Sequence, residues 1–215
     1  IWHSESWQMS ADQGTPEWLA ERCGFITASR MADVLATTKT GEAATRANYR
    51  AELVAQRLTG QIPEGFTNAA MQWGTEQEPF ARATYEIQRG VIVQEVGFIH
   101  HPTIAMSGAS PDGLVDDGLV EIKCPNTATH IDFLLTGKIP NKYVLQMAWQ
   151  MLCTGRKWCD YVSFDPRMPE RMRMKVMRVI DDEVLSLKLE TEVLKFNGEI
   201  EQMVSDLNQI QDTTK

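Results

Sequence analysis

A short apolar segment near the middle of the chain carries two opposite charges at alternate positions. Residues 119–122 are apolar except for Glu121, and Lys123 follows them directly. Alternate residues of a β-strand project to the same face, so Glu121 and Lys123 should point one way and Ile122 the other. Charged groups are costly to bury without partners. The segment therefore predicts a strand that carries a polar site into an apolar sheet.

The residues before this strand predict a hairpin and supply a further carboxylate. Asp116 and Asp117 would mainly shape the turn, which brings Asp112 close to Glu121. Carboxylate oxygens suit Mg²⁺ or Mn²⁺, and a lysine beside them could orient a bound water or stabilise charge on a phosphate. The pattern of Asp112, Glu121 and Lys123 matches the PD-(D/E)xK nuclease signature, although surface hairpins also carry it by chance.

Two other places could supply metal ligands. Glu78 lies in an expected helix ahead of Pro79, where it could present a third carboxylate or remain an ordinary solvated side chain. His100 and His101 are adjacent in the sequence. Neighbouring strand residues face opposite ways, so one buried and one solvated histidine is the favoured interpretation of this pair.

A second polar group lies near the N-terminus. Thr15 and Pro16 begin an expected helix that ends near Gly24, and Arg22 lies just before that turn. Ser29 lies at the start of the next expected helix. A guanidinium group and helix N-terminal amides together favour a phosphate. An ordinary helix cap with a surface arginine explains these residues at least equally well.

The composition permits one domain with mixed secondary structure. The chain has 215 residues, 43% of them hydrophobic, and no apolar run approaches the ~20 residues of a membrane span. Helices are expected at 16–24, from about 27, and at 42–59, 69–89, 131–135, 143–152 and 181–207. Strands are expected at 91–93, 98–99, 105–109, 114–115, 119–122, 161–164 and 172–179. This order predicts a mixed α/β fold with a central sheet flanked by helices, in a single domain over 1–215.

The net charge of −8 disfavours a nucleic-acid partner at first sight, but its distribution matters more. Residues 181–215 hold nine acids and three bases, whereas the rest of the chain holds 20 acids and 18 bases. The acidity is therefore concentrated in the expected C-terminal helix at about 181–207, and a basic groove elsewhere stays possible.

The cysteines and the opening residues bear on the compartment. The four cysteines form no C-x-x-C pair, which disfavours a zinc site built from them and is typical of a reduced protein. The first residues show neither the basic nor the apolar stretch of a secretory signal. We therefore expect a cytoplasmic protein that does not associate with a membrane.

Several short motifs recur in a fixed order along the chain. They are Arg22 with Gly24, the segment 26–29, Trp73-Gly74 with Glu78, the segments 110–114 and 121–125, Gln146-Met147, and the segment 165–168. In this combination the chain resembles the phage lambda-type exonucleases, which are viral recombination nucleases of the PD-(D/E)xK superfamily, over roughly residues 17–180. The resemblance implies a restriction-endonuclease-like fold, with a mixed central sheet flanked by helices.

The resemblance also implies an activity and its partners. Such enzymes digest linear double-stranded DNA from a 5′ end, release 5′-mononucleotides and leave a 3′ single-stranded tail. They form homotrimeric rings around DNA and act with a single-strand annealing protein in phage recombination, in the cytoplasm of the bacterial host. An endonuclease of the same superfamily and a non-catalytic DNA-binding recombination scaffold remain the alternative interpretations.

The resemblance further assigns roles to individual residues. Asp112, Glu121, Glu78 and the backbone carbonyl of Ile122 would hold one or two Mg²⁺ ions, which Mn²⁺ could replace. Lys123 would contact the attacking water. Three residues would bind the terminal 5′-phosphate: Arg22, Ser29 and Ser110. Gln146 matches a glutamine near the metal site, and Gln150 stands where the wider superfamily often has tyrosine, so the role of Gln150 stays open.

Two clusters of basic residues could contact DNA phosphates or form a trimer interface. One cluster shares a helix face: Arg46, Arg50 and Arg57. The other alternates along an expected strand: Arg171, Arg173 and Lys175. An ordinary solvated amphipathic surface is the alternative.

Overall fold

A four-stranded mixed sheet forms the centre of the molecule. The computed structural model describes residues 11–63 and 68–212. The strands are β6 (Gly113–Val115), β7 (Gly118–Lys123), β8 (Trp158–Phe164) and β9 (Met174–Ile180). They lie in the order β6-β7-β8-β9, and β7 and β8 are parallel while the other two pairings are antiparallel. This architecture confirms the mixed α/β prediction.

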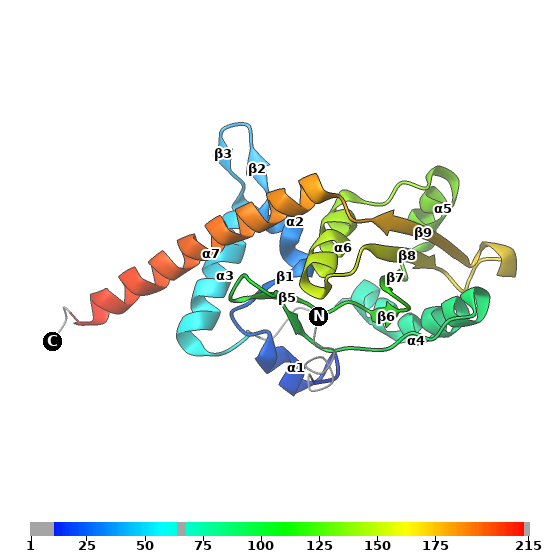
Figure 1. The fold of residues 1–215 in the computed structure, drawn as a ribbon, viewed down its shortest axis with the longest axis horizontal. Coiled ribbons are helices and arrows are strands. Elements are labelled where there is room, and N and C mark those ends of the chain that lie inside the picture. The colour runs from blue at the N-terminus through cyan, green and yellow to red at the C-terminus, as the bar shows by residue number, and fades with distance from the viewer. Residues whose placement is uncertain (1–10, 64–67, 213–215) are drawn as a thin grey trace.

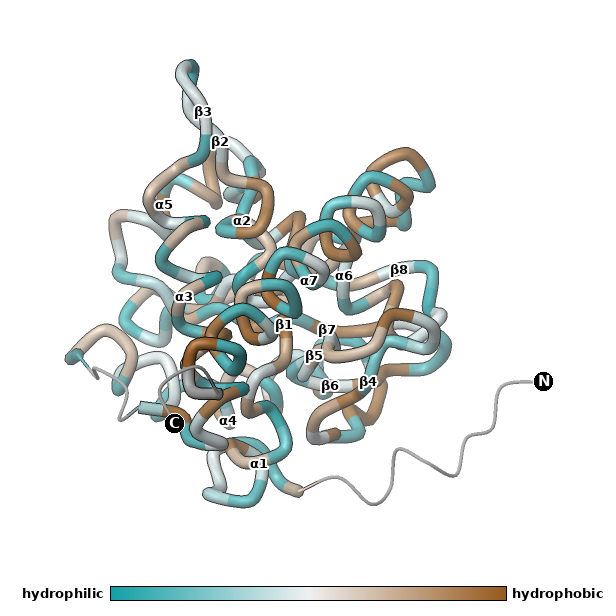
Figure 2. The backbone as a smooth tube through the Cα atoms, turned by 90° about the vertical axis from the view of Figure 1, so that its left-hand side faces the viewer, coloured by the Kyte–Doolittle hydropathy of each residue, from teal (hydrophilic) through white to brown (hydrophobic). Residues whose placement is uncertain are grey.

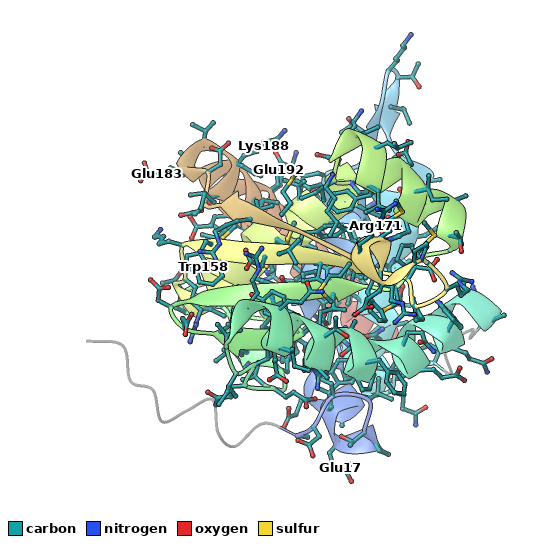
Figure 3. The ribbon with its side chains drawn as sticks, turned by 90° about the vertical axis from the view of Figure 1, so that its right-hand side faces the viewer. Glu17, Trp158, Arg171, Glu183, Lys188 and Glu192 are labelled. Carbon is teal, nitrogen blue, oxygen red and sulfur yellow. The ribbon has the colours of Figure 1, made fainter. Side chains whose placement is uncertain are left out.

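Helices cover both faces of this sheet (Figure 3). Helix α4 (Ala69–Arg89) lies on one face, and α5 (Thr127–Thr136) and α6 (Asn141–Thr154) lie on the other. Both α5 and α6 belong to the connection between β7 and β8, because parallel neighbours need a long crossover. Side chains from alternate positions of β7 reach the two helical layers, as the sequence predicts.

The apolar residues of β7 separate accordingly into two cores. Val120 and Ile122 pack with Val162 and with Ala81 and Tyr85 of α4. Leu119 belongs to the larger core on the other face, which includes Phe133 of α5, Met147 of α6 and Tyr161 of β8. Glu121 therefore lies on the face of the sheet that α6 covers. Its neighbours along β7 pack into an apolar core on each face.

A smaller sheet brings two distant segments together. Its strands are β1 (Ile26–Thr27), β5 (Ser107–Ala109) and β4 (Ile99–His100), in the order β1-β5-β4. Strands β1 and β5 are parallel, with Thr27 opposite Gly108. The chain leaves both strands in the same direction, so the segments that carry Ser29 and Ser110 emerge side by side.

The C-terminal helix connects several parts of the fold. Helix α7 (Glu183–Asp212) packs against α3 (Ala44–Thr59), α2 (Met31–Val34) and α6, and its far end extends beyond the body of the molecule (Figure 1). The short α1 (Pro16–Glu21) lies below β1. A hairpin of β2 (Thr37–Thr38) and β3 (Gly41–Glu42) projects from the body (Figure 2). Within the described residues, no helix combines the length and apolarity needed to cross a bilayer.

Most expected elements are confirmed, because their local signals are strong. Thr15 caps α1 by accepting a hydrogen bond from the backbone N–H of Trp18. Gly60 and Gly90 end α3 and α4 in the left-handed conformation, with φ of 66° and 67°. Some predictions need correction. The segment 91–93 forms no strand, the helix expected from about 27 is a 3₁₀ turn followed by the short α2, and α7 runs to Asp212.

Both basic clusters differ from their predicted form. The face of α3 is covered by α7: the guanidinium groups of Arg46 and Arg50 bind Glu199, and Arg57 donates to Asn197. The sequence left contact with DNA or with another subunit open for this cluster, and the structure shows these three side chains in contacts within the fold. The second cluster is not one strand face.

The strand expected at 172–179 begins two residues later than predicted. Arg171 lies in a 3₁₀-helix, Glu170–Met172, and Arg173 directly follows it. Only Lys175 lies on β9, where its ammonium group donates to the backbone carbonyls of Phe133 and Leu134 at the end of α5.

Candidate active site

A cavity of about 180 Å³ brings together residues from separate parts of the chain. It is lined by five residues that the sequence analysis singled out: Arg22, Ser29, Ser110, Asp112 and Gln146. They come from the end of α1, the segments after β1 and β5, and helix α6. The cavity therefore places the residues expected to bind a phosphate beside Asp112 and Gln146, whereas Glu121, Lys123 and Glu78 do not line it.

The acidic group is organised by the β6–β7 hairpin. Asp112 lies directly before β6, and its Oδ2 accepts a hydrogen bond of 2.6 Å from the backbone N–H of Ile122. Glu121 is fully buried, and Lys123 is paired with its Oε1. The hairpin thus holds both carboxylates and the lysine in one small region.

The charges in this region are unbalanced. Burial, followed by the negative charge of Glu121, raises the pKa of Asp112 well above its usual value. Burial alone would lower the pKa of Lys123, but the charges of Glu121 and Asp112 outweigh it and raise that pKa. Two close carboxylates with one lysine leave an excess of negative charge, and hard oxygen donors of this kind suit Mg²⁺ or Mn²⁺. The residues present therefore fit a divalent cation.

Two glutamines of α6 hold the buried carboxylate. Gln146 Nε2 donates to Glu121 Oε1 at 2.7 Å, and Gln150 Nε2 donates to Glu121 Oε2 at 2.6 Å. Residues four apart lie on the same helix face, so both amides can reach one strand residue. That spacing was the signal that could have found Gln150, but nothing in the sequence shows that α6 packs over Glu121.

Glu78 was expected to lie with Asp112 and Glu121, but its carboxylate contacts an arginine of its own helix instead. Its Oε1 accepts a hydrogen bond of 2.8 Å from Arg82, one turn further along α4. Its negative charge still contributes to the raised pKa of Asp112, so it lies near the acidic group. Within 11–63 and 68–212, no three His, Cys, Asp or Glu side chains form a cluster that could hold a metal. The three-carboxylate arrangement is therefore not formed in this structure.

The residues expected to bind a phosphate include an arginine that forms no ion pair with any described residue. The Nε of Arg22 is buried and has no hydrogen-bond partner, and Arg22 makes no ion pair with any described residue. Burial lowers its pKa. Its guanidinium carbon lies 3.9 Å from the ring centre of Trp18, whose indole N–H donates to Ser110 Oγ at 3.0 Å. An unpaired cation at the wall of a cavity favours an anionic ligand.

The motif at 165–168 supports a neighbouring part of the structure. Asp165 is buried and accepts hydrogen bonds from Arg167 and from Thr127. The guanidinium group of Arg167 lies 4.4 Å from the ring centre of Trp73 in α4. Two motifs far apart in the sequence are thus in contact, and the contact ties the loop after β8 to the helix that carries Glu78.

The adjacent histidines take the arrangement favoured by the sequence. His101 is buried and stacks on Trp149, with ring centres 4.8 Å apart, while His100 is exposed. His101 Nδ1 accepts a hydrogen bond of 3.0 Å from the backbone N–H of Ile104. Neither residue lines the cavity, so the pair has a structural role.

Comparison with known proteins identifies the family and the fold of the chain. The family model described as a YqaJ-like viral recombinase domain matches residues 17–157. The crystal structure of LHK-Exo, an alkaline exonuclease from Laribacter hongkongensis, is 53% identical with a TM-score of 0.87, over 94% of this chain and 100% of that one. LHK-Exo has also been crystallised in complex with dAMP. No curated protein matches the chain.

A more distant structure shows the same fold. It is a phage related exonuclease from Haemophilus somnus 129PT, 16% identical with a TM-score of 0.67, over 85% of this chain and 96% of that one. The arrangement of strands and helices, together with the likeness to LHK-Exo, confirms the restriction-endonuclease-like fold. This chain belongs to the YqaJ-like viral recombinase family, and it is a nuclease homologue of the phage lambda exonuclease type.

Proposed function

We propose that this protein is a metal-dependent exodeoxyribonuclease that digests linear double-stranded DNA from a 5′ end. It would release 5′-mononucleotides and leave a 3′ single-stranded tail for phage recombination by strand annealing. The observation that carries the proposal is the shared cavity, in which Arg22, whose guanidinium group forms no ion pair with any described residue, and the carboxylate of Asp112 line one space. An enzyme that removes terminal nucleotides needs both an anion site for the end and an acidic site for the reaction.

The two ends of the cavity would bind two different phosphates. Arg22, Ser29 and Ser110 would hold the terminal 5′-phosphate, because they supply a guanidinium group and hydroxyl donors. The next phosphate along the strand would then lie at the acidic group. This division explains why cleavage would release one nucleotide at a time, and the dAMP bound to LHK-Exo is a nucleotide of that class.

The acidic group would prepare the scissile phosphate for attack. Asp112, Glu121 and the Ile122 carbonyl are the groups that would hold Mg²⁺, and Glu78 would join them by exchanging its contact with Arg82 for the cation. When bound, the ion would activate water and neutralise charge on the phosphate. Lys123 would contact the attacking water and stabilise the negative charge that develops on the phosphate oxygens. Gln146 lines the cavity, so it can contact both Glu121 and the substrate.

The assembly of the protein follows from the same proposal. Residues 1–215 would form one nuclease domain, and three copies would form a ring around DNA. Such a ring would hold DNA by enclosing it, which lessens the need for strong phosphate pairing by an acidic protein. The partner would be a single-strand annealing protein, in the cytoplasm of a bacterial host.

The deciding experiment is digestion of linear duplex DNA labelled at either end, in the presence of Mg²⁺. Early release of the label from the 5′ end, as a mononucleotide, is expected. Release from the 3′ end first would contradict the proposed polarity. Covalently closed circular DNA should stay intact, and its nicking would favour an endonuclease instead.

A catalytic test distinguishes the enzyme from a DNA-binding scaffold. Lys123→Ala should reduce digestion about 100-fold or more, because it removes the ammonium group that would contact the attacking water and stabilise charge on the phosphate. Unchanged digestion by this variant would show that the assigned active site is wrong.

A further inference from the structure

We propose that Gln150 is a positioning residue, which holds the Glu121 carboxylate in the orientation that binds the divalent cation. This inference rests on the proposed function, because it concerns the same site. Gln150 does not line the cavity and is fully buried, so it cannot reach DNA. Any effect on the reaction must therefore pass through Glu121.

The contact itself is short and enclosed. Gln150 Nε2 lies 2.6 Å from Glu121 Oε2, and both side chains have no solvent exposure. Hydrogen bonds to an ionised acceptor are among the strongest in proteins. Water cannot replace this donor without entering the core, so the amide is the local partner for that oxygen.

The orientation of the Gln150 amide follows from the charge of its neighbour. If the amide were rotated, its carbonyl oxygen would face the carboxylate, and two acceptors would repel each other. In the observed orientation Gln150 Oε1 is buried and has no partner among the described residues. A buried carbonyl without a donor is unfavourable. An apolar side chain would avoid that penalty, but it would leave Glu121 Oε2 without this donor.

The two glutamines donate to different oxygens of the Glu121 carboxylate. Glu121 Oε1 receives both Lys123 and Gln146, which together use its acceptor capacity. Among the described residues Oε2 receives Gln150 alone, so one lone pair of this oxygen remains for a cation. Gln150 therefore determines which way the remaining lone pair points. Removing it would let the carboxylate rotate about its terminal bond.

The test is the affinity of the protein for Mn²⁺ alone, measured by calorimetry in the absence of DNA. Gln150→Met has a similar volume but no donor. We expect its Mn²⁺ affinity to fall about 10- to 100-fold, as for other groups that orient a metal ligand. In digestion assays kcat should fall at a fixed Mn²⁺ concentration, while KM for DNA and the preference for a 5′-phosphate stay unchanged.

Thr154→Val is the matched control. Thr154 lies one turn further along α6, is also enclosed, and donates to the backbone carbonyl of Gln150 without touching Glu121. The control should lose some thermal stability and keep the wild-type Mn²⁺ affinity. If Gln150→Met does not fold, Gln150→Asn serves instead, because its shorter side chain withdraws the donor from Glu121.

Each alternative outcome is separable. A loss of stability with unchanged Mn²⁺ affinity would overturn the inference and leave Gln150 as a purely structural residue. A raised KM for DNA with unchanged Mn²⁺ affinity would also overturn it. Glu121→Gln provides the reference: if that variant binds Mn²⁺ like the wild type, the proposed metal site itself is wrong. If only the Gln150 variants behave like the wild type, the metal site stands and this inference fails.

Discussion

The carboxylate of Asp112 accepts a hydrogen bond from the backbone N–H of Ile122, at 2.6 Å, and Ile122 separates Glu121 from Lys123 in the sequence. The contact holds the Asp112 carboxylate against the backbone of β7, at the residue that follows Glu121. The hairpin is thus both a structural element and the frame of the proposed metal site.

Replacement of Asp112 by asparagine should separate stability from activity. The new amide would keep an acceptor for Ile122. It would remove a carboxyl group whose pKa is raised by burial and by the charge of Glu121. We expect Asp112→Asn to raise the melting temperature in a chelator, to lose the further stabilisation by Mn²⁺, and to lose digestion. Thermal denaturation with and without Mn²⁺ measures both effects on stability. A lower melting temperature in the chelator would contradict the electrostatic argument.

Replacement of Arg22 should act on one kind of DNA end. Arg22→Gln should slow digestion of 5′-phosphorylated ends by about 10- to 100-fold, which corresponds to one lost charge-assisted hydrogen bond. Ends with a 5′-hydroxyl should be affected little, since they lack the phosphate. Arg30→Gln is the control, because Arg30 is already paired with Asp33 and Glu52. Equal slowing on both kinds of end would refute the phosphate site.

Helix α7 covers the face of α3 that carries Arg46. A substitution that removes this contact should lower stability without weakening DNA binding. Glu199 pairs with Arg46, whose side chain is only 9% exposed. Glu199→Gln should lower the free energy of unfolding by about 1–3 kcal/mol, because it leaves a nearly buried cation with fewer partners. Chemical denaturation measures this, and Glu52→Gln, in a pair with Arg30 whose two side chains are 41% and 34% exposed, should change it by less than about 1 kcal/mol. Weaker DNA binding with unchanged stability would restore the DNA-facing interpretation.

His101 predicts a dependence of stability on pH. Burial lowers the pKa of His101 from 6.5 to about 4. Its Nδ1 already accepts backbone N–H groups, and Glu190 lies 3.6 Å from its Nε2. The unfolded chain therefore binds a proton at a higher pH than the folded protein. The contribution of His101 to stability should be complete above pH 6.5 and should fall by up to about 3 kcal/mol as the pH drops to 4.

Replacement of His101 tests this dependence. His101→Asn removes the titrating group while keeping an acceptor near the position of Nδ1. The variant should be less stable overall, because it loses the stacking on Trp149, but its stability should fall less steeply between pH 6.5 and 4. His100→Asn, at the exposed neighbour, should keep the wild-type slope. The same slope in all three proteins would show that other groups control the acid transition.

Local patterns predicted elements where each signal lay within a few residues. The alternation in β7 correctly separated Glu121 from Ile122, and Gly60 and Gly90 marked the ends of two helices. Two-residue strands such as β1 and β2 were missed, because so few residues show no periodicity. The strand expected at 91–93 does not form, although its apolar run is typical of a strand. Val91 and Val93 pack beside α4, Ile92 is exposed, and the ladder contact that follows them is the isolated Gln94–Leu114 bridge.

The features of the candidate site can be separated in the same way, into those that local sequence predicts and those that packing decides. By itself the sequence determined which residues share a face and which motifs resemble a nuclease, since both depend on neighbours in the chain. Only the tertiary structure decided that Gln150 faces Glu121 across 29 positions, that Arg46 meets Glu199 across 153, and that Arg22 has no counter-ion among the described residues. A residue's own neighbours indicate its polarity and direction. Whether a charge becomes a ligand site or a structural contact depends on the segment that packs against it, and that is settled by burial of the whole core.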